Sequence, residues 1–150
     1  MSIHDHVDIP HQRYWEFTVF RIKPGHEKEW SDLTKIYTDG YAKTPEAHWA
    51  TFENQYGSDG GACLVATPMR SLSEVDQEMT DDKQLKDTLG ADGMKKLAEL
   101  ETACVESVSS NLFQFAPKMS YPRDEWVKAD PGFWKRSAAP AKKEAAKAKQ

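Results

Sequence analysis

The stretch YWEFTVFRI, residues 14–22, decides the fold, and the turn-forming residues Lys23, Pro24 and Gly25 follow it. Its aromatic and β-branched residues predict a β-strand, and the proline and glycine predict where that strand ends. Side chains of a strand alternate between its two faces. Here both faces are apolar: one carries Trp15, Phe17 and Val19, and the other carries Tyr14, Phe20 and Ile22. Neither face can be left in water, so something must cover each of them.

The chain after this strand changes to a helical period over residues 26–42. Apolar positions fall within one arc of about 100° of the helix, and Pro45 predicts where the helix ends. Two strands are then expected at 47–56 and 62–69, because the glycine-rich residues 57–61 between them favour a hairpin. The inward arc of the helix carries Trp30, Leu33, Tyr37, Gly40 and Tyr41.

Two further helices and a last strand are predicted in the second half. Ser71 and Glu74 have the spacing of a capping box, which predicts a brief helix with Leu72, Val75 and Met79 inward. The polar stretch around Thr80–Lys83 and the glycines at 90 and 93 are expected to separate this helix from a long helix over residues 91–109. The last strand is expected over residues 111–117. One stripe of the long helix carries Met94, Leu97, Ala98, Cys104, Val105 and Val108.

This order of elements predicts an α+β fold, the ferredoxin-like βαββαβ antiparallel sheet with helices on one face, over residues 13–118. Helices on one face leave the other apolar face of the first strand bare. The simplest cover is the same face of a second copy, so we expect a homodimer.

Composition limits the class of protein. The chain has 150 residues, 39% of them hydrophobic, and a net charge of −4, which indicates one globular domain without a basic field for nucleic acid. The absence of a membrane span or a secretory signal predicts a cytoplasmic protein. Cys63 and Cys104 are expected to be buried thiols, and the histidines near the N-terminus to be incidental, so no metal or other cofactor is predicted. No phosphate loop, GxSxG, HExxH or dinucleotide motif is present.

The two ends of the chain fall outside the expected domain. Residues 1–12 form an N-terminal lead. Residues 119–136 are predicted to be an ordered aromatic arm that docks on the body or on the partner chain, because it carries Tyr121, Trp126, Phe133 and Trp134. Residues 137–150 form a basic tail without large apolar side chains, which we expect to be disordered and dispensable.

A family resemblance rests on four stretches: the opening strand with Lys23-Pro24-Gly25-His26-Glu27, the helix ending at Tyr41, the strand with His48-Trp49, and Ser110-Asn111-Leu112-Phe113. Together they resemble the dimeric α/β-barrel superfamily, especially its NIPSNAP-like and antibiotic-biosynthesis-monooxygenase-like domains. The resemblance covers residues 12–120 and implies dimers that pair sheet against sheet. The superfamily includes cofactor-independent oxygenases, haem-degrading enzymes and aldoxime dehydratases. The Asn, Trp and His set of the haem-degrading members cannot be placed here, so haem is not carried over.

Candidate site residues come from polar groups on apolar faces. Glu101 lies in the middle of the long helix's stripe. It is either an acid or base facing a cavity, or a glutamate that reaches the edge of the core or pairs with an arginine or lysine. His48 is the other candidate catalytic group, with a hydrogen-bonded structural histidine as the alternative. Glu16 is either a second cavity carboxylate or, as we favour, half of an ion pair at the dimer interface. The expected ligand-binding residues are Trp30, Tyr37, Tyr41 and Trp49.

Two functions remain open. In the first, the protein binds a small aromatic or hydrophobic ligand between helices and sheet, as a binding protein or as a cofactor-independent oxygenase-like enzyme. In the second, it is a non-catalytic homodimeric interaction module that uses its aromatic C-terminal arm. An enclosed cavity next to Tyr37 and Glu101 would favour the first function, and a filled core would favour the second.

Overall fold

The computed structural model describes residues 2, 8–42, 44, 47–57 and 61–135. The chain divides into two compact units, Met1–Phe115 and Ala116–Gln150, which are described separately. The basic tail expected over residues 137–150 lies outside the described residues, as does most of the N-terminal lead. Within the described ranges, no helix is long and apolar enough to cross a membrane.

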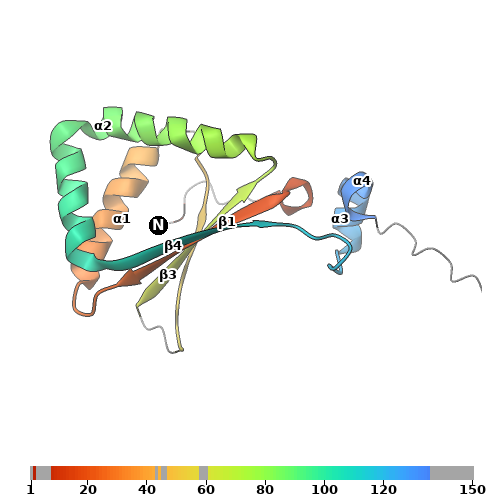
Figure 1. The fold of residues 1–150 in the computed structure, drawn as a ribbon, viewed down its shortest axis with the longest axis horizontal. Coiled ribbons are helices and arrows are strands. Elements are labelled where there is room, and N and C mark those ends of the chain that lie inside the picture. Colours follow the sequence, from red (N-terminus) through yellow and green to blue (C-terminus); the bar gives the residue numbers. More distant parts are fainter. Residues whose placement is uncertain (1, 3–7, 43, 45–46, 58–60, 136–150) are drawn as a thin grey trace, which may run out of the picture. The chain divides into compact units, whose positions relative to one another are not determined.

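The first unit contains a four-stranded sheet (Figure 1). Its strands are β1 (Tyr14–Ile22), β2 (Ala50–Glu53), β3 (Ala62–Met69) and β4 (Val105–Gln114). They lie in the order β2-β3-β1-β4, and every neighbouring pair is antiparallel. The two-sided apolar strand β1 is thus a central strand. The 3-10 turn Ile9–His11 precedes β1.

Two helices, α1 (Glu27–Tyr41) and α2 (Ser73–Cys104), lie on one side of this sheet (Figure 1). The ring of Phe20 on β1 contacts that of Trp30 on α1, with 5.4 Å between centroids. The main core cluster joins the two helices through Leu33, Leu97 and Cys104. The predicted α+β, ferredoxin-like architecture is therefore confirmed.

Helix α2 contains both expected helices, with one difference. Its 32 residues comprise two helices that meet at a kink at Gly90 (φ 63°, ψ −176°). The expected long helix therefore begins after Gly90 as predicted, and the helix before it is longer than the brief one expected. The polar stretch around Thr80–Lys83, which we took for a break, is helical. It contains no proline or glycine, and the Thr80 hydroxyl donates to the Asp76 carbonyl one turn earlier. Polarity alone therefore did not end the helix.

The boundary between α2 and β4 also differs from the expected one. Helix α2 ends at Cys104 instead of reaching residue 109, and β4 begins at Val105 instead of residue 111. Val105 and Val108 are therefore strand residues, paired with Ile22 and Phe20 of β1. β-Branched valines suit a pleated strand better than a helix, and long-range pairing with β1 outweighs the helical spacing.

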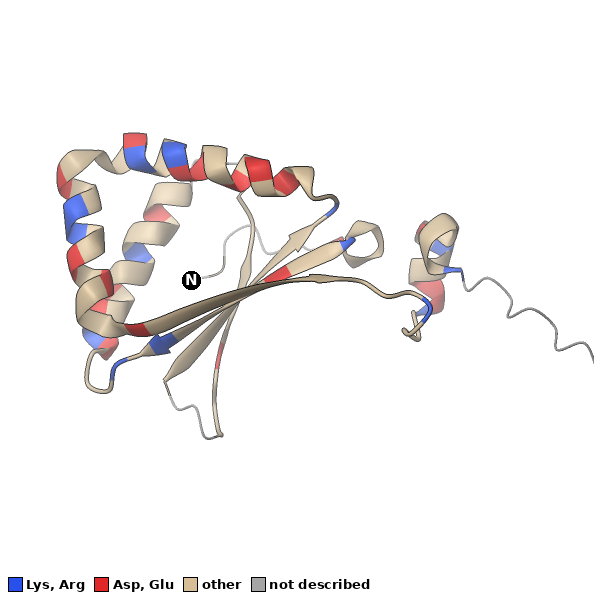
Figure 2. Ribbon diagram, in the orientation of Figure 1, with Lys and Arg blue, Asp and Glu red and all other residues tan. Residues whose placement is uncertain are grey.

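The first half of α2 has the reverse of its expected orientation. Leu72, just before the helix, Val75 and Met79 were predicted to face inward, but all three side chains are exposed. Asp81 and Leu85 are buried instead. Figure 2 shows the acidic residues of this half of α2.

The sheet face opposite the helices is largely apolar on β1, β2 and β3, and we call it the bare sheet face. The registers also place Arg21, Ser109 and Asn111 on this face. Trp15 stacks on Phe17 with ring centroids 5.8 Å apart, and Phe17 meets Phe113 of β4 edge to face at 5.6 Å. Phe113 and Phe52 are about half exposed. The strand registers place these residues on the bare sheet face: Trp15, Phe17, Val19, Ala50, Phe52, Leu64, Ala66, Pro68 and Phe113. The second copy expected to cover it stays a prediction.

The second unit contains two short helices, α3 (Asp124–Ala129) and α4 (Pro131–Trp134). The buried Trp134 ring contacts Trp126 and Phe133 at centroid distances of 5.3 and 4.9 Å. The carboxylate of Asp130 accepts a hydrogen bond of 3.2 Å from the Phe133 N–H and so caps α4. The aromatic arm therefore has its own ring cluster, and its docking on the body or a partner stays a prediction.

Candidate functional site

A pocket of about 1090 Å³ lies between the helices and the sheet, and we call it the helix–sheet pocket. Its floor comes from side chains of β1 and β3 on the helix-covered face, and its walls come from α1, the first half of α2 and the residues before β2. Residues from each of these elements line it: Thr18, Phe20, Tyr37, Tyr41, His48, Trp49, Val65, Thr67, Met69, Glu78, Asp81 and Asp82. The space between helices and sheet is thus not filled by side chains.

One wall of this pocket is aromatic. The rings of Tyr37 and Tyr41, one helical turn apart on α1, are nearly parallel with centroids 6.4 Å apart. Trp49 meets Tyr41 edge to face at 5.2 Å. Such flat, rigid surfaces offer large contact area to another planar group.

The adjoining wall is acidic and comes from α2. Asp82 accepts a hydrogen bond of 2.5 Å from the Tyr41 hydroxyl, and Asp81 accepts one of 2.9 Å from the Gln77 amide. Glu78 shares a hydrogen bond with Glu16 on β1. Burial first, and then the charges of Glu16, Asp82 and Asp81, raise the pKa of Glu78 to about 7. Glu78 thus carries a proton that can be exchanged near neutral pH.

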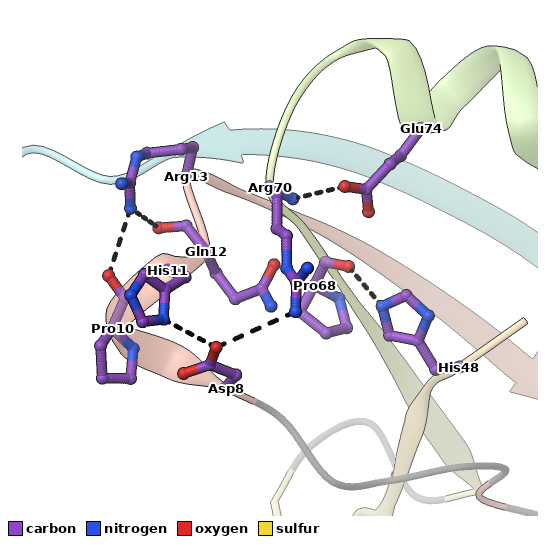
Figure 3. Close-up of polar contacts among 9 residues, drawn as sticks. All are labelled: Asp8, Pro10, His11, Gln12, Arg13, His48, Pro68, Arg70 and Glu74. Carbon is purple, nitrogen blue, oxygen red and sulfur yellow. Dashed lines mark hydrogen bonds and ion pairs between the residues drawn. The ribbon is translucent and has the colours of Figure 1, made fainter. Parts of the chain in front are cut away.

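A polar corner lines the pocket at the end of β3 (Figure 3). The imidazole Nε2 of His48 lies 3.0 Å from the Pro68 carbonyl oxygen, and the Arg70 guanidinium lies 3.9 Å from the Asp8 carboxylate. The backbone N–H of Arg70 donates to Glu74. Beside them Gln12 is 4% exposed, and its Oε1 atom has no hydrogen-bond donor among the described residues.

Glu101 does not line the helix–sheet pocket. Its carboxylate accepts a hydrogen bond of 2.6 Å from the Tyr37 hydroxyl. Burial, together with this carboxylate, raises the pKa of Tyr37 above its ordinary value. The partner is a tyrosine hydroxyl instead of the arginine or lysine expected for a structural pair, and a catalytic role for Glu101 stays a prediction.

The other sequence-predicted residues divide between two cavities. Tyr37, Tyr41, His48 and Trp49 line the helix–sheet pocket together. Trp30 lines a smaller cavity of about 540 Å³ instead. That smaller cavity also contains Cys63, whose burial raises the thiol pKa to about 11.

Glu16 does not lie where we favoured it. It shares the helix-covered face of β1 with Thr18 and Phe20 and contacts Glu78, so it is away from the bare sheet face. The alternative, a second carboxylate on the cavity side, fits this position. The pairing could not be predicted because it depends on the reversed orientation of α2.

Several pocket residues were missed from the sequence. Glu74, Glu78 and Asp81 repeat at helical spacing, but we read residues 80–83 as a polar break and therefore did not place them on one helix face. Gln12 and Arg70 lie outside regular elements and gave no signal. Among the described residues, no group of three His, Cys, Asp or Glu side chains could hold a metal ion.

Comparison with known proteins gives a likeness of structure without one of sequence. No protein-family model matches the chain, and no curated protein matches it. An uncharacterised NIPSNAP-like domain protein from Burkholderia xenovorans superposes with a TM-score of 0.51 at 9% identity, covering 75% of this chain and 91% of that one. A protein from Agrobacterium tumefaciens gives a TM-score of 0.51 at 12% identity, covering 69% and 93%. These likenesses show the fold: this is an α+β chain with a NIPSNAP-like fold.

Proposed function

We propose that the protein binds a small molecule with an aromatic or hydrophobic body in the helix–sheet pocket. The observation that carries this proposal is the pocket itself, about 1090 Å³ with an aromatic wall. Pockets for small organic ligands are roughly 300–1,000 Å³ and combine apolar walls with a few polar groups. The Tyr37, Tyr41 and Trp49 rings would contact the flat part of such a ligand.

The enzymatic form of this proposal is a cofactor-independent oxygenase-like reaction on the bound ligand. The polar groups that line the pocket include His48 and Glu78, which could exchange protons with a ligand. His48 and Glu101 remain the predicted catalytic residues, and only His48 of these two lines the pocket. We therefore propose ligand binding as the function, and a reaction on the bound ligand only as its extension.

The second candidate function is a homodimeric interaction module. The bare sheet face favours it, because aromatic rings such as Phe113 and Phe52 are about half exposed there. The edge strand β4 adds a further exposed surface, since nearly all of its residues are exposed. A homodimer is compatible with ligand binding, because the helix–sheet pocket lies on the other side of the sheet.

Binding is tested with 2-naphthylmethanol, a neutral planar probe, by isothermal titration calorimetry. We expect saturable binding with one site per chain. Val65 lines the pocket, and Val65→Phe should lower the affinity at least tenfold by filling it.

Val75→Phe is the matched control, because the same change then lies on the exposed side of α2. It should leave the affinity within twofold of the parent protein. No binding to the parent protein, or equal losses in the two variants, would contradict a ligand site in this pocket.

A further inference from the structure

The first half of α2 buries Leu85, but it also buries Asp81 on the pocket side and leaves the apolar side chains of Val75 and Met79 exposed. Asp81, which lines the pocket, is 6% exposed, whereas the Met79 side chain two residues earlier is 72% exposed. An ordinary amphipathic helix buries its apolar stripe. The reversed arrangement costs stability on both sides of the helix, and such conflicts are expected at functional sites.

The acidic wall lacks cationic partners. In the described ranges, no lysine or arginine forms an ion pair with Glu78, Asp81 or Asp82, whose partners are Glu16, Gln77 and Tyr41. The one arginine that lines the pocket, Arg70, is largely exposed and lies near Asp8 instead. Asp81 is buried and Glu78 is half-buried, whereas Asp82 is exposed. Carboxylates withdrawn from water without a positive charge are costly, so a cation in the pocket would lower that cost for Glu78 and Asp81.

Gln12 supplies a second and independent sign of a missing ligand group. Its side chain lines the same pocket, it is 4% exposed, and its Oε1 atom has no donor in the described part of the chain. It lies next to Pro68 and Arg70 at the end of β3 (Figure 3). The backbone N–H of the following residue, Arg13, donates to the Met69 carbonyl at 2.8 Å. A buried acceptor without a donor costs about 1–3 kcal/mol, and an N–H group in the pocket would satisfy it.

We propose that the helix–sheet pocket selects an organic cation, a molecule with an aromatic or hydrophobic body and a protonated amine. The amine would lie against the carboxylates of α2, with Gln12 Oε1 as a further acceptor, and the body would lie against the aromatic wall. Tyr41 and Trp49 add to the selection, because aromatic faces attract cations. The pocket is far larger than a metal ion, which favours an organic ligand.

The protonation of Glu78 agrees with this selection. With the pocket empty, burial and the facing charges of Glu16 on β1 and of Asp81 and Asp82 on its own helix raise the pKa of Glu78 to about 7. The other titratable groups lining the pocket are Tyr37 and Tyr41 on α1, His48, and Arg70, Glu74 and Asp8 around the polar corner. A bound cation would favour the ionised carboxylate and so release a proton.

The inference rests on the proposed function, and three probes with the same ring separate the two. These are 2-naphthylmethylammonium, 2-naphthylmethanol and 2-naphthoate, titrated into the protein at pH 7.5. We expect the ammonium to bind at least tenfold more tightly than the alcohol, and the carboxylate to bind more weakly than either. Equal affinities for all three would overturn the cation preference and leave the proposed function standing. Binding of none would overturn both.

Variants locate the preference. The double variant Glu78→Gln and Asp82→Asn should lower the ammonium affinity at least tenfold and leave the alcohol affinity within threefold. Asp87→Asn, an exposed carboxylate of the same helix that does not line the pocket, should change neither. If the double variant does not fold, Gln12→Met removes only the buried acceptor and should still weaken ammonium binding severalfold. Unchanged ammonium binding in a folded variant would overturn the assignment.

Discussion

At the scale of single residues, Glu78 lies beside the carboxylate of Glu16, and burial together with nearby negative charges raises its pKa. The pKa of Glu78 is about 7 in the folded protein against an ordinary value of 4.5. The folded state therefore binds more protons than the unfolded state between these values, so this group's contribution to stability is present below about pH 4.5 and is lost as the pH rises to about 7.

Glu78→Gln should therefore stabilise the protein at pH 8 and not at pH 4. The expected gain at pH 8 is about 1 kcal/mol, which allows for the partial exposure of the side chain to water. Urea unfolding of the parent and the variant at both values checks it. A stability difference that is independent of pH would show that Glu78 has an ordinary pKa.

Glu101 makes a second prediction at this scale, because it accepts the hydrogen bond of the partly buried Tyr37 hydroxyl. Glu101→Leu should destabilise the protein by about 1–3 kcal/mol, since the hydroxyl loses its acceptor. Tyr37→Phe in the same background should recover part of the loss. Thermal unfolding of the single and double variants measures this coupling, and purely additive effects would contradict the hydrogen bond.

At the scale of elements, most of the first unit could be predicted from the sequence, and α2 is the exception. The strand β1, the helix α1 and the strand β3 were predicted within a residue or so, because aromatic density, helical period and glycine or proline at the ends agree there. The first half of α2 was not, because it buries Asp81 and exposes Met79. A rule that places apolar residues inward therefore predicted the wrong face, and with it missed Glu78 and the acidic wall.

The bend of α2 makes a prediction of its own. Gly90 has φ 63° and ψ −176°, a conformation that is essentially limited to glycine, and an added Cβ would meet no neighbour within 4 Å. Gly90→Ala should therefore destabilise by about 1–3 kcal/mol through the backbone alone. Asp87→Ala, exposed on the same helix, should stay within about 0.5 kcal/mol of the parent. Chemical unfolding checks both, and an unaffected Gly90→Ala variant would mean that the helix does not need this bend.

At the scale of the whole molecule, the bare sheet face predicts a homodimer. Light scattering at micromolar concentration should give twice the 17.0 kDa chain mass. Phe113→Asp places a charge on the bare sheet face and should shift the mass toward the monomer. Leu112→Asp is the control, because this neighbouring residue is similarly exposed on the other face of β4. A monomeric parent protein, or dissociation by both variants alike, would contradict this interface.

The most direct test of a ligand site in the helix–sheet pocket uses the five tryptophans as reporters. Trp49 lines the pocket, Trp30 lines the smaller cavity, Trp15 lies on the bare sheet face, and Trp126 and Trp134 belong to the second unit. Their indole N–H resonances are followed by ¹H–¹⁵N NMR during titration with 2-naphthylmethylammonium. We predict that the Trp49 resonance shifts far more than the other four, and that its shift saturates at the ligand concentration at which binding saturates. Shifts concentrated on Trp15, or on Trp126 and Trp134, with Trp49 unchanged would contradict it.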